Sequence, residues 1–223
     1  MNTHILNTLE AALQAYGQQA QKDAKPLIKQ LLNVFSAEKA YMEKVSDLDK
    51  AFDDQPSFEA LREVMFDLLL INFFTDDVNK LEEDYLDSPE WEAIEEETLD
   101  RGTELLNVLL YLKECQDEDI EPELSDFLKE FLLVDEDEFQ DEHRIYEEVI
   151  ANQILMESSV NEIAKVAEKI KQDTELKDLF YPMMCFFRNP QPSAQEQEEV
   201  NSNAIQPAFD IAVYQLLINF NHQ

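Results

Sequence analysis

One histidine in the middle of the chain stands among carboxylates at a spacing that could bind a metal. His143 lies one helical turn before Glu147 in the acid-rich run DEDEFQDEHRIY, and histidine with carboxylates holds paired metal ions in some helical bundles. Such sites normally use two Glu-x-x-His pairs, but Gln140 occupies the glutamate position before His143, and His4 and His222 are far away in the sequence. A structural histidine packed between aromatic neighbours is the simpler interpretation. A metal-dependent helical-bundle enzyme that uses carboxylates with His143 stays as the alternative.

The same run has acids at alternate positions, as a calcium-binding EF-hand loop does. Asp135, Asp137 and Asp141 stand at such positions. However, Gln140 replaces the glycine of the turn and Tyr146 replaces the closing glutamate, so the ligand set is incomplete. We therefore expect no calcium site, and no other bound metal or cofactor.

Other catalytic motifs are poorly supported. Gly17 and Gly102 are the only glycines, which excludes the glycine-rich loops that bind phosphates or dinucleotides. Cys115 and Cys185 are far apart and form neither a disulfide framework nor a zinc knuckle. A nucleophilic pair of either cysteine with His143 stays open, because spacing alone gives no geometry. We expect no catalytic residue, and hence a protein that is not an enzyme.

Acidic residues dominate the charge of the chain. The 223 residues include 50 acids and 17 bases, a net charge of −33. Residues 75–148 alone hold 29 acids and 5 bases, so this third carries most of the excess. Nucleic acids and anionic membranes are poor partners for such a surface, since both attract positive charge.

This concentration of acids suggests a surface that receives a basic protein. The partner-binding residues that we predict are Glu90, Glu92, Glu95, Glu96, Glu97, Asp100, Glu104, Asp135, Glu136, Asp137, Glu138, Asp141 and Glu142. One form of such binding is mimicry of a nucleic acid, which would inhibit a nucleic-acid-binding protein. The competing interpretation is an acidic, soluble protein whose charge is only a solvated face.

The elements that must position these acids are helices. Two glycines are too few for a sheet joined by tight turns, and apolar residues recur at helical spacing along most of the chain. We predict an all-α fold, a single irregular bundle of about nine or ten helices over residues 1–223. Two of these helices, each containing the sequence LLINF (69–73 and 216–220), are apolar on nearly every side and are expected to be centrally buried.

Local signals place several helix boundaries. Ser88 and Pro89 predict the start of an acidic helix that could continue to about Cys115, and Ser159 with Glu162 has the spacing of a capping box. Residues 188–206 are rich in Pro, Gln, Ser and Asn, which predicts a flexible linker before a C-terminal helix that docks in the core.

The compartment is also an expectation from composition. The first residues lack the basic region of a signal peptide, and the longest apolar runs are shorter than the ~20 residues that span a bilayer. We expect a soluble, cytoplasmic protein. Its oligomeric state does not follow from the sequence.

Overall fold

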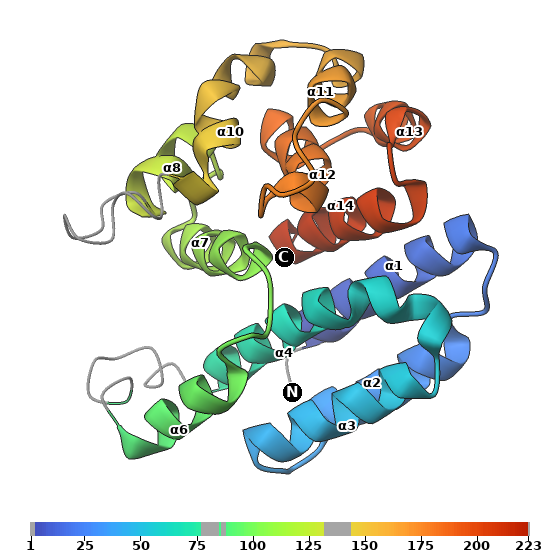
Figure 1. Ribbon diagram of the computed structural model, residues 1–223, viewed down its shortest axis with the longest axis vertical. Helices are drawn as coiled ribbons and strands as arrows, with labels where there is room; N and C mark the ends of the chain where they lie inside the picture. The colour runs from blue at the N-terminus through green and yellow to red at the C-terminus, as the bar shows by residue number, and fades with distance from the viewer. Residues whose placement is uncertain (1–2, 77–84, 86–87, 132–143, 223) are drawn as a thin grey trace.

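The computed structural model describes residues 3–76, 85, 88–131 and 144–222 (Figure 1). These residues form twelve α-helices and two 3-10 helices, with no strand among them. The prediction of an all-α fold is confirmed. The helix count exceeds the nine or ten expected, since a helix as short as α10 (Glu147–Ala151) has too few turns to show a periodicity in the sequence.

The described helices divide between the two halves of the chain. The first half consists of α1 (Thr3–Ala20), α2 (Lys25–Ser36), α3 (Tyr41–Asp53), the 3-10 helix η1 (Pro56–Leu61), α4 (Arg62–Asp76), α6 (Pro89–Thr98) and α7 (Leu105–Glu118). The second half consists of α8 (Leu124–Phe131), α10, the 3-10 helix η3 (Gln153–Glu157), α11 (Val160–Ala167), α12 (Lys177–Arg188), α13 (Ala194–Asn203) and α14 (Pro207–Asn221). None of these helices is both long enough and apolar enough to cross a bilayer.

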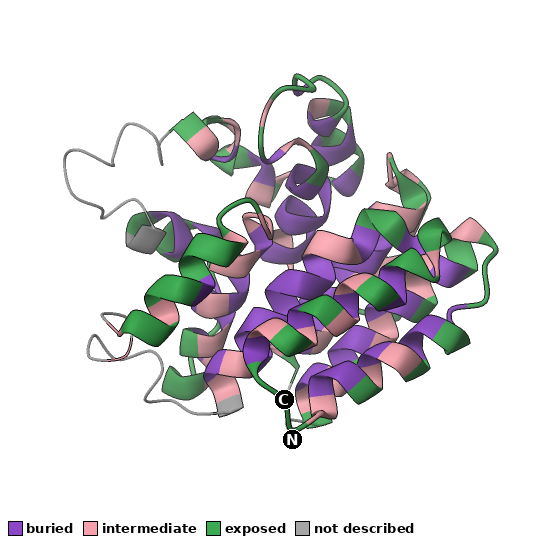
Figure 2. Cartoon of the chain, turned by 60° about the horizontal axis from the view of Figure 1, so that its bottom comes forward, coloured by how far each residue is buried: buried purple, intermediate pink, exposed green. Residues whose placement is uncertain are grey.

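The C-terminal helix joins the two halves of the molecule. α14 packs along α1 on one side and against α12 on another (Figure 1). Its side chains Tyr214, Leu217 and Phe220 are at most 1% exposed. Elsewhere, too, buried residues lie where helices meet, and exposed residues cover the outside (Figure 2). One continuous core therefore links helices from the beginning and the end of the chain.

Two predicted helix starts are confirmed. The Ser88 side chain accepts a hydrogen bond from the Trp91 backbone at the start of α6. Ser159 and Glu162 form the capping box of α11, in which each side chain accepts from the other residue's backbone N–H. Serine in this position satisfies N–H groups that lack a partner within the first turn of a helix.

The segment 188–206 differs from its prediction as a flexible linker, because it contains α13. Ser193 and Glu196 form a capping box at its start, and Val200, only 2% exposed, anchors it to the protein interior. A polar helix with one buried apolar residue has no apolar periodicity, so composition alone indicates a loop.

Val200→Ala is therefore expected to lower the free energy of unfolding by about 2 kcal/mol, the cost of removing two buried carbon groups and leaving a small cavity. Urea denaturation measures this change. Gln195→Ala, an exposed position on the same helix, is the matched control and should change stability little. If both variants unfold like the wild type, α13 contributes nothing and the segment behaves as a linker.

Candidate protein-binding surface

Helix α6 carries the first group of predicted partner-binding acids and is attached to the protein along one side. Ile94 is 6% exposed, and the Trp91 ring lies 5.2 Å from the Phe74 ring of α4, measured between ring centroids. Ser88 and Pro89 define the first turn. Because these contacts occupy one side only, the rest of the helix faces solvent.

The acids on and just after α6 are exposed and have no partner among the described residues. Within the described part of the chain, no side-chain hydrogen bond or ion pair joins a partner to Glu90, Glu92, Glu95, Glu96, Glu97 or Asp100, all of which are exposed. Leu99, at the end of the helix, is 78% exposed. A dense negative charge and an accessible apolar side chain thus occur together.

The long helix expected from Ser88 to about Cys115 is instead two helices. α6 ends at Thr98 and α7 begins at Leu105. Gly102, between them, has a φ of +86°, a conformation that residues with a side chain rarely adopt. The sequence prediction was wrong here because helical periodicity resumes after the break in a similar pattern of apolar residues.

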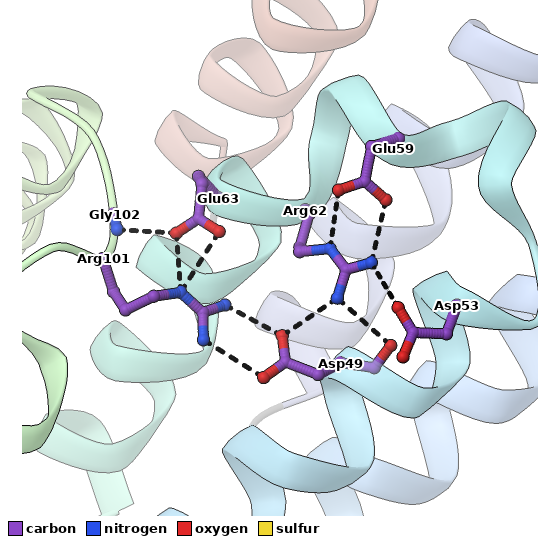
Figure 3. Close-up of polar contacts among 7 residues, drawn as sticks. All are labelled: Asp49, Asp53, Glu59, Arg62, Glu63, Arg101 and Gly102. Carbon is purple, nitrogen blue, oxygen red and sulfur yellow. Dashed lines mark hydrogen bonds and ion pairs between the residues drawn. The ribbon is translucent and has the colours of Figure 1, made fainter.

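Arg101 anchors this break to the helices beneath it. Its Nε donates to both carboxylate oxygens of Glu63, at 3.1 and 3.0 Å, and its terminal nitrogens donate to Asp49 at 3.2 and 3.0 Å (Figure 3). The guanidinium also lies 4.8 Å above the Phe66 ring. The Gly102 N–H donates to Glu63 at 2.8 Å. Helices α3 and α4 therefore both hold the segment that follows α6.

A second arginine neutralises acids in the same region. Arg62 donates to both carboxylate oxygens of Glu59, at 2.9 and 2.8 Å, to Asp53 at 2.7 Å, and to Asp49 at 3.3 Å (Figure 3). Bidentate pairing of a guanidinium with a carboxylate is a strong and directional contact. The acids beside α4 are thus compensated within the protein, whereas no described residue compensates those of α6.

A buried carboxylate completes the anchor. Asp67 of α4 is fully buried and accepts hydrogen bonds from the Thr103 backbone N–H at 3.0 Å and from the Thr103 hydroxyl at 2.5 Å. Burial raises the pKa of Asp67 to about 8, although both Thr103 donors favour the ionised form. A Cβ on Gly102 would lie 2.6 Å from Asp67 Oδ1, so this close approach requires glycine.

Glu104 is separate from the acids of α6. It is half-buried and accepts hydrogen bonds from the Tyr146 hydroxyl at 2.9 Å and from the Asn107 amide at 3.0 Å. Burial raises the pKa of Glu104. Its carboxylate therefore joins α7 to the start of α10 rather than extending the row of free acids.

The second predicted group, Asp135, Glu136, Asp137, Glu138, Asp141 and Glu142, lies outside the described residues, as does His143. Among the residues that are described, no three His, Cys, Asp or Glu side chains gather as a metal site would require. Cys115 and Cys185 are both buried and form no disulfide with each other. Burial raises the pKa of the Cys185 thiol to about 12, which disfavours the reactive thiolate.

The anchoring residues Arg101, Asp67 and Asp49 were not predicted from the sequence. One signal was present, because Arg101 is the only basic residue between Lys80 and Lys113 and precedes one of the two glycines. A single cation in an acidic stretch has many carboxylates available, and sequence spacing does not identify which of them it contacts.

Comparison with known proteins gives no relative for this arrangement. No protein-family model matches the chain, and no curated protein or solved structure is significantly similar to it.

Proposed function

We propose that α6 and the exposed Leu99 form a docking surface for a basic protein, and that the chain acts as a non-enzymatic interaction protein. The observation that carries this proposal is the contrast in charge compensation. Arg62 and Arg101 neutralise the acids beside α4, while six exposed acids on and just after α6 have no such partner among the residues that the structure describes.

A cationic partner would relieve repulsion that is present in the free protein. Glu92 and Glu96 are four residues apart, and Glu92 and Glu95 are three apart, so like charges face each other along the helix. Each such pair costs a few tenths of a kcal/mol. A basic surface would remove this cost and would also be attracted over several ångströms, which speeds association.

The support beneath α6 favours binding with little reorganisation. Glu63 and Asp67, both on α4, hold the segment after α6 through Gly102 and Thr103, and we take α4 as the central support of this surface. A surface that is already ordered loses less entropy on association than a disordered acidic tail does. Mimicry of a nucleic acid is one form that the interaction could take.

Neutralisation of the outer acids tests the proposal. Replacing Glu92, Glu95, Glu96 and Glu97 with glutamine is expected to slow association with the basic partner by tenfold or more at low salt and to flatten its salt dependence. Partners are captured from a lysate with the wild-type protein. The association rate of each purified partner is then measured across a salt series.

A matched variant separates this surface from general acidity. The control replaces four exposed acids in the C-terminal part of the chain with the corresponding amides, which changes the net charge equally. These acids are Glu157, Glu168, Asp173 and Glu198. This control should retain most of the association rate. If both variants slow association equally, the charge is only a solvated face and α6 is not a specific surface.

A further inference from the structure

A pocket of about 1030 Å³ opens beside the acidic helix. Its walls are the connection between α2 and α3, part of α4, and one face of α6. Glu90, Ala93, Ile94 and Glu97 form that face, since residues three and four apart align on a helix. The acidic surface and the pocket therefore share a wall.

The floor of the pocket is apolar and partly aromatic. Leu69 and Phe73 come from α4 and Phe35 from α2, and Tyr41 lies against Phe73 with ring centroids 4.8 Å apart. Ile94 of α6 completes this apolar lining. Aliphatic and aromatic surfaces of this kind favour the burial of an apolar group.

Two largely buried polar side chains line the pocket without a hydrogen-bond partner among the described residues. Asn72 of α4 lines it and is only 4% exposed, yet no hydrogen bond joins its side-chain amide to another described residue. The Tyr41 hydroxyl is likewise without a partner among the residues described. The Asn72 amide is not fully enclosed, so a group bound in the pocket can reach it and supply the hydrogen bonds that buried amides normally make. Asn72 can both donate and accept, as a peptide group does.

The charges around the pocket are mostly negative. Glu38 and Glu43 stand on the α2–α3 side, across from Glu90 and Glu97 on α6. Lys39 and Lys44 also line the pocket. Lys39 pairs with Asp47, and the Lys44 ammonium keeps its charge while it donates to the neutral Phe35 carbonyl at 3.2 Å. The four carboxylates outnumber the two ammonium groups, and this excess of negative charge favours a cation.

We propose that this pocket receives one apolar side chain of the basic partner. The adjacent main chain of the partner hydrogen-bonds to Asn72, and neighbouring lysine or arginine side chains lie against Glu90 and Glu97. The inference rests on the proposed function and names what the partner must contain, an apolar anchor within a basic segment. A peptide is favoured over a small molecule because only an extended chain also reaches Glu92 and Glu96 on the outer side of α6.

Two synthetic peptides test the pocket with the full-length protein. Each is a capped ten-residue peptide of lysine and arginine, with either phenylalanine or serine at its centre. The phenylalanine peptide is expected to bind the wild-type protein roughly tenfold or more tightly than the serine peptide, the gain from burying one aromatic side chain. Its binding should also shift the NMR signals of the Asn72 side-chain amide.

Asn72→Leu is the decisive variant. It keeps the branched shape of the side chain, with larger methyl groups that can extend into the pocket, and removes the unpaired amide. The melting temperature should therefore stay the same or rise, while the affinity for the phenylalanine peptide falls at least severalfold. Ala93→Trp, on the exposed wall, should block the pocket and bring the affinity ratio of the two peptides close to one. An unchanged ratio in Ala93→Trp, or equal affinity of the wild type for both peptides, would overturn the inference.

The same measurements distinguish the pocket from the wider surface. Glu92→Gln with Glu96→Gln should weaken both peptides alike and leave their ratio intact. Loss of the phenylalanine preference with retained α6 dependence overturns the pocket alone, whereas a preference without α6 dependence overturns the proposed function alone. If phenethylamine, a small aromatic ammonium, binds as tightly as the phenylalanine peptide, the pocket is a small-molecule site and the peptide assignment is wrong.

Discussion

Removal of residues 207–223 is expected to abolish cooperative folding. The deletion takes away α14, which packs on both α1 and α12 and has nine buried residues. It also removes the Phe220 carbonyl, which accepts hydrogen bonds from His4 Nε2, at 2.7 Å, and from the Gln116 side chain. Burial of each large apolar side chain contributes about 1.5–3 kcal/mol, so the total loss is as large as the ~5–15 kcal/mol by which domains are normally stable.

Single substitutions measure how much individual positions contribute to stability. Leu217→Ala, at a fully buried position, should lower the free energy of unfolding by about 2–5 kcal/mol, whereas Ser202→Ala, at an exposed position, should change it by less than about 0.5 kcal/mol. Urea denaturation measures the substitutions, and size-exclusion chromatography follows aggregation of the truncated protein. A truncated protein that stays monomeric with an unchanged melting temperature would show that α14 is dispensable.

Features set by neighbouring residues could be predicted from the sequence. The low glycine content excluded hairpins, and the apolar spacing indicated helices. The cap at Ser88 and the capping box at Ser159 depend only on residues within one turn, and both are present. The exposed acids of α6 follow from the same local pattern.

Features set by distant contacts could not be predicted. Arg101 lies 52 residues from Asp49 and 38 from Glu63, and only the packing of α3 on α4 brings those carboxylates together. The break between α6 and α7 depends on these contacts and on the positive φ of Gly102. From the sequence, Glu104 is indistinguishable from the other acids of the region. Its contact with Tyr146, 42 residues away, is visible only in the structure.

Asp67→Asn is expected to change how stability depends on pH. In the wild type, the folded-state pKa of about 8 is well above the ordinary value near 3.9 of an unfolded chain. The stability associated with the protonated carboxyl is therefore fully present below about pH 4 and is lost as the pH rises to about 8. The asparagine variant does not titrate. From pH 5 to pH 9, the free energy of unfolding of the variant minus that of the wild type should therefore rise by about 2–4 kcal/mol.

Urea denaturation of both proteins at pH 5 and pH 9 measures this difference, with Asp173→Asn as a control that removes an exposed negative charge. Asparagine can still accept from the Thr103 N–H, so the segment after α6 should stay anchored, and any general loss of packing would appear equally at both pH values. The measurement distinguishes two opposing effects on the pKa of Asp67: burial raises it, and the two hydrogen bonds from Thr103 lower it. If the two proteins differ in free energy of unfolding by the same amount at pH 5 and pH 9, the Thr103 donors outweigh burial and Asp67 is ionised throughout. If the asparagine variant is more stable than the wild type only at pH 9, burial outweighs the donors, and ionisation of Asp67 weakens the support of α6.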